Sequence, residues 1–176
     1  MRLSSTYASQ LCREINYNKI PVDPTEIAKM KGIEVVEDEA EGYTGMLLVV
    51  DGEAMISVKR SMREVTRKRF TISHELGHYT IPDHITPQQT IFQCSDKDLT
   101  TFGKIDNKEI EANCFAAELL LPEDHFKKRV QYKDLNKRLL DDLCSEFETS
   151  LTATGIRFVT FRPEYAVVFS ENSRIR

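Results

Sequence analysis

The sequence predicts an α+β fold, in which a small sheet packs against helices. Three short runs rich in β-branched residues lie within residues 33–58, and the Asp51-Gly52 pair between the last two is typical of a tight hairpin turn. Two longer segments follow, stopped by Pro82 and Pro122, and both read as helices. Three short strands followed by a long helix are characteristic of an α+β layer arrangement.

The amino-terminal elements follow from periodicity and turn residues. Tyr7, Leu11 and Ile15 recur at four-residue spacing, which predicts a helix over residues 4–17. A short helix over residues 25–31 opens at Asp23 or Pro24 and ends at Gly32. The three expected strands span Ile33–Glu37, Tyr43–Val50 and Ala54–Val58.

The helix that ends before Pro82 carries the chemistry. Ser61 and Glu64 form a capping-box pattern that predicts its start. It contains the run His74-Glu75-Leu76-Gly77-His78. Histidines four residues apart share one helix face, so both imidazoles can bind one zinc ion, and Glu75 can reach a water bound to that metal. Gly77 costs helix stability but permits close packing, so we expect another element to lie against it.

A second long helix is expected from Lys108 to Leu121, after an irregular segment over residues 81–107. A loop of that length often forms a lid or a cleft wall. The helix is apolar on nearly every side, which predicts a buried helix. Glu111 and Glu118 are then unexplained, because a buried carboxylate is costly unless it is paired or bound to a metal.

These residues supply the candidates for a third metal ligand, since a catalytic zinc site uses three protein ligands and one open position. His84 is one candidate, because its spacing from His78 is that of the metzincin signature. However, Ile81 stands where that signature has a glycine, and a β-branched residue resists the positive φ of such a bend. Glu111 is the favoured candidate, as a carboxylate from a second helix, and Glu118 on the same face is a third choice.

The remaining residues predict short helices and a terminal hairpin. Helices are expected at Asp124–Val130, around Leu135–Phe147, and at Leu151–Phe158 with Ser150 as its cap. A strand is expected at Tyr165–Phe169, then a turn over 171–173 and a return strand over 174–176. We therefore expect a core over residues 1–130 and a small helical segment with a β-hairpin over residues 131–176.

Composition narrows the class of protein. The 176 residues carry a net charge of -4 and include four scattered cysteines, which we expect to be free thiols. An acidic balance argues against direct nucleic-acid binding, and no apolar run reaches membrane-spanning length. The amino terminus lacks the apolar stretch of a secretory signal, so we expect a cytoplasmic protein. Cys94 could approach the metal, although a buried, idle thiol is the simpler interpretation.

Two long motifs in this order resemble the ImmA/IrrE family of metallopeptidases. They are Arg69-Phe-Thr-Ile-Ser-His-Glu-Leu-Gly-His78 and Glu109-Ile-Glu-Ala-Asn-Cys-Phe-Ala-Ala-Glu-Leu-Leu-Leu-Pro122. Residues 21–28 and 32–36 are similar to the family's opening, so the resemblance covers about residues 1–125. The resemblance implies a zincin-type, gluzincin-like fold with Glu111 as third ligand. It also implies a cytoplasmic protease that cleaves a cognate helix-turn-helix repressor.

The expected activity is zinc-dependent peptide hydrolysis with Glu75 as the base. We expect the substrate to add a strand to the sheet at Tyr43–Val50. Two alternatives belong to other classes. A transcription regulator would bind DNA through residues 143–158, which resemble a helix-turn-helix segment, and would need a basic surface there. A zinc-stabilised interaction module would use a closed, four-ligand site and would have no use for Glu75.

Overall fold

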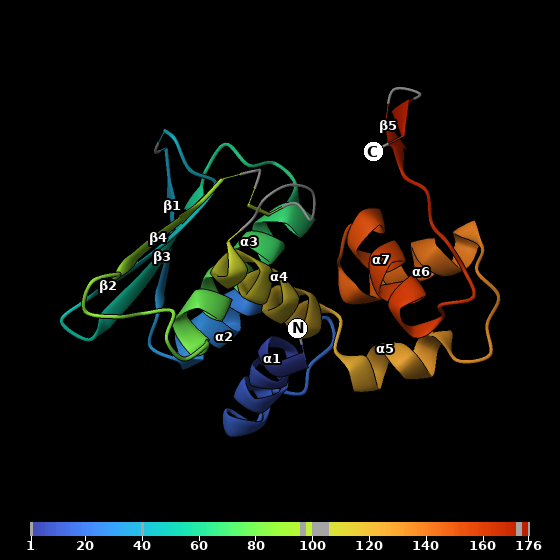
Figure 1. Cartoon of the computed structure of the whole chain (residues 1–176), viewed down its shortest axis with the longest axis horizontal. Helices are drawn as coiled ribbons and strands as arrows, with labels where there is room; N and C mark the ends of the chain where they lie inside the picture. Colours follow the sequence, from blue (N-terminus) through green and yellow to red (C-terminus); the bar gives the residue numbers. More distant parts are fainter. Residues whose placement is uncertain (1, 40, 96–97, 100–105, 172–173, 176) are drawn as a thin grey trace.

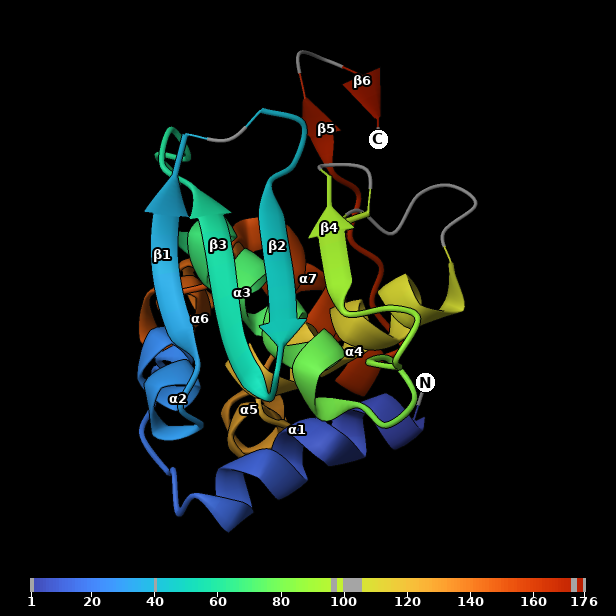
Figure 2. The same cartoon turned by 90° about the vertical axis from the view of Figure 1, so that its left-hand side faces the viewer.

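A small sheet, a helical layer and a second helical group succeed one another across the molecule (Figure 1). The computed structural model describes residues 2–39, 41–95, 98–99, 106–171 and 174–175. In Figure 2 the sheet faces the viewer and the helices lie behind it. The seven described helices and the mixed four-stranded sheet confirm the predicted α+β class.

The four-stranded sheet has the strand order β1-β3-β2-β4. Its members are β1 (Glu34–Asp38), β2 (Gly45–Val50), β3 (Glu53–Lys59) and β4 (Ile91–Cys94). β1 runs parallel to β3, whereas β2 is antiparallel to both β3 and β4. Asp51 and Gly52 have φ values of 51° and 86°, so the hairpin expected from this pair is confirmed.

The first helical layer consists of α1 (Arg2–Glu14), α2 (Pro24–Met30), α3 (Val65–Thr80) and α4 (Asn107–Leu120). Beyond it lie α5 (Glu123–Val130), α6 (Lys137–Phe147) and α7 (Leu151–Phe161). Asp23 caps α2 by accepting hydrogen bonds from the backbone of Thr25 and Glu26, as its position predicts. Within the described residues, no helix is both long and apolar enough to cross a membrane.

Two hydrophobic cores hold these layers together. The first joins the inner face of the sheet to α1–α4 through side chains such as Leu47, Ile56, Leu76 and Phe115. The second joins α5, α6 and α7, and it already includes Leu121 at the end of α4. α4 is therefore shared between both cores, which fixes it on two sides.

Three local predictions are corrected. α3 begins at Val65 with Glu64 as its N-cap, so Ser61 does not cap it. Residues 81–107 are not wholly irregular, because they contain the edge strand β4; residues 96–97 and 100–105 of this segment lie outside the described residues. Tyr43–Val50 was expected to offer a free edge, but β2 lies between β3 and β4 and is bonded on both sides.

The carboxyl-terminal strand is also shorter than expected. Residues 165–169 are not a strand, because they pass over α7, where an added Cβ at Gly155 would lie 2.8 Å from the Phe169 ring. β5 (Ser170–Glu171) instead pairs with β6 (Arg174–Ile175). Asn172, Ser173 and Arg176 of the predicted turn and return strand lie outside the described residues.

The element that we expected to lie against Gly77 is α4. A Cβ added at Gly77 would lie 3.1 Å from the Cα atom of Ala112 and 3.2 Å from the Phe115 side chain. Backbone atoms of a packed helix cannot move aside cheaply, so the glycine lets α3 and α4 approach each other closely.

We predict that Gly77→Ala lowers the free energy of unfolding by up to about 2 kcal/mol. Helix propensity alone would favour alanine by about 1 kcal/mol, but overpacking against Ala112 costs about 1–3 kcal/mol. Urea unfolding followed by circular dichroism measures the difference. A gain in stability near the helix-propensity value would show that the α3–α4 contact does not require glycine.

Candidate metal centre

α3 presents three titratable side chains to the interior of the molecule. His74 and Glu75 are 0% exposed and His78 is 1% exposed, because α3 packs against both α4 and the sheet. The two histidines lie one turn apart, so both rings reach the same space between α3 and α4.

In that space, two imidazole nitrogens and a carboxylate from α4 converge. The Nε2 atoms of His74 and His78 are 3.1 Å apart. Glu109 Oε2 lies 3.0 Å from His74 Nε2, and Glu109 Oε1 lies 3.4 Å from His78 Nε2. Ligand atoms of a tetrahedral zinc ion, each about 2.0–2.1 Å from the metal, lie about 3.3 Å from one another. These three residues therefore fit a first-row metal ion.

Asn113, one turn after Glu109 on α4, fixes the orientation of the first imidazole. Its side-chain nitrogen donates to the carbonyl of Asp98 at 2.7 Å, which leaves its oxygen facing His74 Nδ1 at 3.0 Å. His74 therefore donates from Nδ1, as the hydrogen-bond pattern assigns it, and this leaves its Nε2 atom to bind a metal ion or, without one, to donate to Glu109. A hydrogen bond of this kind orients metal-binding histidines in many proteins.

The electrostatics favour a cation at the point of convergence. Burial lowers the pKa of His74, but its hydrogen bond to Glu109 and the nearby carboxylates raise it more, so the pKa lies above its usual value. Burial raises the pKa of Glu109, but the hydrogen bonds from His74 and His78 lower it more. The pKa of Glu109 therefore lies well below the usual range. Burial lowers the pKa of His78 to about 4, so that imidazole is neutral. A proton or a metal ion can supply the positive charge that these groups share.

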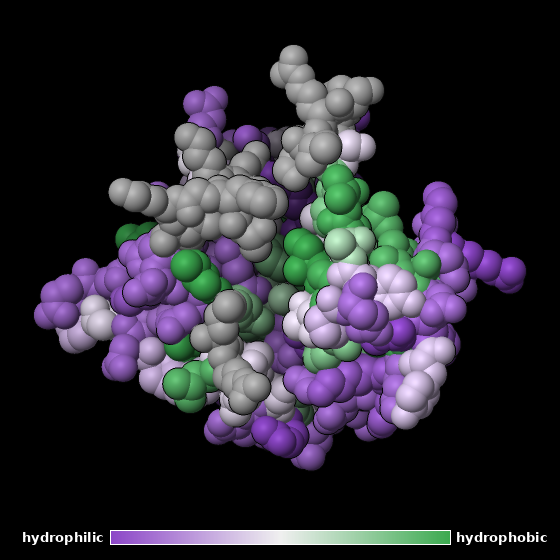
Figure 3. All heavy atoms as spheres, turned by 45° about the vertical axis from the view of Figure 1, so that its right-hand side comes forward, coloured by the Kyte–Doolittle hydropathy of each residue, from purple (hydrophilic) through white to green (hydrophobic). Residues whose placement is uncertain are grey.

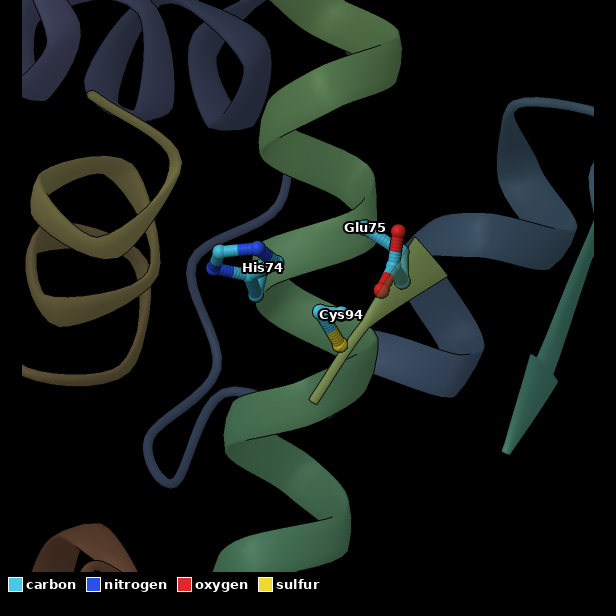
Figure 4. Close-up of side chains that lie close together, drawn as sticks. All are labelled: His74, Glu75 and Cys94. Carbon is cyan, nitrogen blue, oxygen red and sulfur yellow. The ribbon is translucent and has the colours of Figure 1, made fainter. Parts of the chain in front are cut away.

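Glu75 points to a different side of α3 from His74, and Cys94 of β4 lies between them in Figure 4. Both carboxylate oxygens are buried and accept no hydrogen bond from the described residues. Burial raises the pKa of this carboxyl to about 7. A buried carboxylate without partners is costly for folding, and such groups are concentrated at catalytic sites.

Gly45 brings β2 close to this carboxylate. A Cβ added there would lie 2.3 Å from Thr71, 2.9 Å from Glu75 Oε1 and 3.0 Å from Cys94 Sγ. Cys94 itself is 1% exposed, and burial raises the pKa of its thiol far above the usual range. It therefore stays a neutral thiol beside Glu75, as expected for a buried cysteine.

Glu111 does not join the two histidines of α3. Its side chain is 45% exposed, and its carboxylate lies 3.0 Å from His84 Nε2 instead. Glu109 and Asn113 face α3, so the side chain at position 111 points to another side of α4. Glu109, and not Glu111, therefore lies beside the two histidines of α3. His84 also lies apart from the point of convergence, although it contacts His78.

Glu118, the remaining candidate ligand, has a structural explanation. Its carboxylate is ion-paired with Arg157 of α7 and accepts hydrogen bonds from Ser9 and from the backbone of Glu123. Arg157 also donates to the carbonyl of Leu121 at 3.0 Å. This buried carboxylate is thus satisfied by protein groups, and it joins α4 to α1 and α7.

Sequence reasoning missed Glu109 and Gly45, and it marked Asn113 as unexplained on a buried helix without giving it a role. A signal for Glu109 and Asn113 was present, because residues 109, 112, 113 and 116 lie on one helix face and include Ala112 and Ala116, whose small side chains suit a close helix contact. Nothing in the sequence around Gly45 marks its contact with Glu75, which depends on how β2 and α3 are packed.

Comparison with known proteins gives two findings. The model of the Peptidase_M78 family, described as the IrrE N-terminal-like domain, matches residues 28–159. Among solved structures, a Mycobacterium tuberculosis transcriptional regulator is similar with 18% sequence identity and a TM-score of 0.58, over 90% of this chain and 47% of that chain. The chain thus spans about half the length of that regulator, and the likeness is one of fold. No curated protein sequence matches significantly.

We predict that Glu109→Ala lowers the affinity for zinc by more than about 100-fold, which exceeds the usual cost of losing an outer-shell partner. Glu111→Ala should lose much less, because the Glu111 carboxylate is bonded to His84 and not to the two histidines of α3, and Glu118→Gln should keep the metal. Metal content after dialysis against a chelator buffer measures all three variants. Loss of zinc from Glu111→Ala, with Glu109→Ala unaffected, would restore Glu111 as the ligand.

Proposed function

The chain belongs to the family of the IrrE N-terminal-like domain, and we propose that it is a zinc-dependent endopeptidase that cleaves a partner protein at specific sites. Its ligands would be His74, His78 and Glu109, with Glu75 as the catalytic base. The observation that carries this proposal is the convergence of two Nε2 atoms and a carboxylate beside a buried, unpartnered glutamate. A purely structural metal site would have no use for Glu75.

His74, His78 and Glu109 would hold the zinc ion, which would supply the Lewis acidity that polarises the scissile carbonyl and makes a water acidic near neutral pH. Glu75 accepts one proton from the attacking water as the carbon–oxygen bond forms. It then returns this proton to the amide nitrogen as the carbon–nitrogen bond breaks, so the carboxylate is regenerated. Its pKa of about 7 suits a group that both accepts and donates a proton at neutral pH.

β4 is the strand that we propose for substrate binding, in place of the Tyr43–Val50 edge. It is the edge strand nearest the site, and it ends at Cys94, whose buried side chain lies beside Glu75. Its pairing with β2 leaves the other edge of the strand without a ladder partner among the described residues. An extended peptide could add a strand there, with main-chain hydrogen bonds holding it across the site.

We propose a DNA-binding, helix-turn-helix repressor as the protein substrate, which would place the reaction in the cytoplasm. The support is the family and the sequence resemblance, because a strand-edge site by itself accepts many extended segments. Selectivity would then come from docking contacts away from the reacting groups.

His84 is excluded as a free donor to the substrate carbonyl, since both of its ring nitrogens face other side chains.

Direct DNA binding through α7 has little support, although α6 begins with the exposed cations Lys137 and Arg138, which lie outside the predicted segment 143–158. The exposed side chains of α7 are Leu151, Thr152, Ile156 and Thr160, none of which is a cation. Arg157, the cation of this helix, is 13% exposed and is paired with Glu118. Figure 3 shows hydrophobic surface next to hydrophilic surface on the side that carries these helices, rather than a continuous hydrophilic face. DNA binding needs a basic surface.

We predict that Glu75→Gln keeps the fold and the bound zinc but lowers the rate of cleavage by at least about 100-fold, the lower range for a general acid–base group. The amide cannot accept a proton from water, whereas the ligands are untouched. Cleavage of a fluorogenic peptide that contains the repressor site, together with metal content, measures both effects. Near-normal turnover would remove Glu75 from the mechanism.

We predict that the zinc-loaded protein cuts a cognate repressor at one or a few sites and leaves casein largely intact. Docking contacts are specific to the partner, and unfolded casein offers only the strand edge. Gel electrophoresis with mass spectrometry of the products measures this, and Glu75→Gln is the matched control for contaminating proteases. Rapid digestion of casein with the repressor intact would contradict the proposed substrate.

A further inference from the structure

His84 links a residue of the candidate metal centre to the surface. Its ring is 2% exposed and lies after α3, where Asp83 has a φ of 66° and turns the chain back toward the helix. His84 Nδ1 lies 3.0 Å from His78 Nδ1, and His84 Nε2 lies 3.0 Å from Glu111 Oε2. Two hydrogen bonds therefore run from the surface carboxylate to the ring nitrogen of His78 that faces away from Glu109.

For a neutral His84 ring beside a carboxylate, the hydrogen-bond inventory allows only one ordering of the protons along this chain. An ionised Glu111 can only accept, so His84 must donate from Nε2. The neutral His84 ring then has a lone pair on Nδ1, and His78 must donate from its own Nδ1 atom. The reverse tautomer of His84 would set a nitrogen lone pair against the carboxylate at 3.0 Å, which is repulsive. His78 is thereby left with an unprotonated Nε2 atom, whose lone pair a cation shared with Glu109 would take up.

The surroundings hold His84 firmly in this place. Phe92 of β4 stacks on His78 with ring centroids 4.3 Å apart. The same Phe92 ring also stacks on His84, with centroids 6.2 Å apart. Lys108 of α4 donates to the backbone carbonyl of His84 at 3.0 Å and to Gln89 at 2.9 Å. Contacts from β4 and α4 therefore fix both the ring and the backbone, so the two hydrogen bonds keep their geometry.

We propose that His84 and Glu111 are positioning residues that set the tautomer and orientation of His78, so that its Nε2 lone pair is ready for the metal. This inference rests on the proposed zinc site, and it gives His84 and Glu111 a role outside the ligand set. Asn113 orients His74 by a single hydrogen bond, whereas His78 is oriented through a second histidine. Neither His84 nor Glu111 touches the substrate in this account.

The first test reads the tautomer directly in the metal-free protein. Nitrogen-15 NMR of labelled histidines should show His78 protonated at Nδ1 and unprotonated at Nε2. Glu111→Gln introduces an amide that can donate to His84, so it should populate the opposite tautomer of His78. His84→Asn should preserve the wild-type tautomer, because the asparagine oxygen replaces the Nδ1 acceptor. A merely structural role for His84 would leave the tautomer of His78 independent of the residue at position 111.

The second test measures zinc affinity by competition with a chromophoric chelator. His84→Phe keeps an aromatic ring beside Phe92 but removes the acceptor, so the affinity should fall by about 10- to 100-fold. The zinc affinity of His84→Asn should stay within about threefold of the wild type. The affinity of Glu111→Gln should fall by about 3- to 10-fold, since Glu111 lies one hydrogen bond further from His78 than His84 does. His125→Phe, a substitution at an exposed histidine, is the matched control and should change nothing.

The outcomes separate this inference from the zinc site itself. If His84→Phe and Glu111→Gln both keep the wild-type tautomer and zinc affinity, the positioning role is wrong. If His84→Phe does not fold, the other two variants decide. The positioning role is supported when His84→Asn matches the wild type and Glu111→Gln shifts the tautomer of His78. The positioning role is wrong when Glu111→Gln also matches the wild type. Failure of the wild type to bind zinc would instead contradict the proposed function, and the NMR result would still decide the tautomer.

Discussion

The close approach of α3 and α4 at Gly77 sets the geometry on which the candidate metal centre depends. α3 supplies the imidazoles and α4 supplies the carboxylate, so the ligand set exists only at the separation that a glycine permits. At that separation, Nε2 of His74 lies 3.0 Å from Glu109 Oε2. A side chain at position 77 would widen this space, and ligand geometry tolerates only small errors.

The sheet adds the second constraint, because it closes the other side of α3. Gly45 of β2 allows the strand to lie against Thr71 and Glu75, and Cys94 of β4 fills the remaining space. The Glu75 carboxylate is therefore enclosed by a strand, a thiol and its own helix, which explains its raised pKa. Two glycines in separate elements thus produce the two properties of the candidate site, namely converging donor atoms and a desolvated carboxylate.

The sequence predicted the elements better than it predicted which of their faces meet. The motif of α3, the hairpin at Asp51-Gly52 and the two proline stops are local signals, and the structure confirms them. The choice of Glu111 assumed that α4 is buried on every side, whereas that side chain is 45% exposed. β4 escaped prediction because a four-residue strand in a polar segment has almost no periodicity to detect. Its position depends on β2, a partner that is distant in sequence.

The carboxyl-terminal helices are connected to the site through both of its helices. Glu118 of α4 pairs with Arg157 of α7, and Arg69 of α3 pairs with Glu148 in the turn between α6 and α7. Arg69 also donates to the carbonyl of Val22 at 2.6 Å, which ties the same point to the chain just before α2. Because rigid helices transmit displacements along their length, the packing of α6 and α7 helps to hold α3 and α4 in register. The second core therefore supports the ligand geometry although it contributes no ligand.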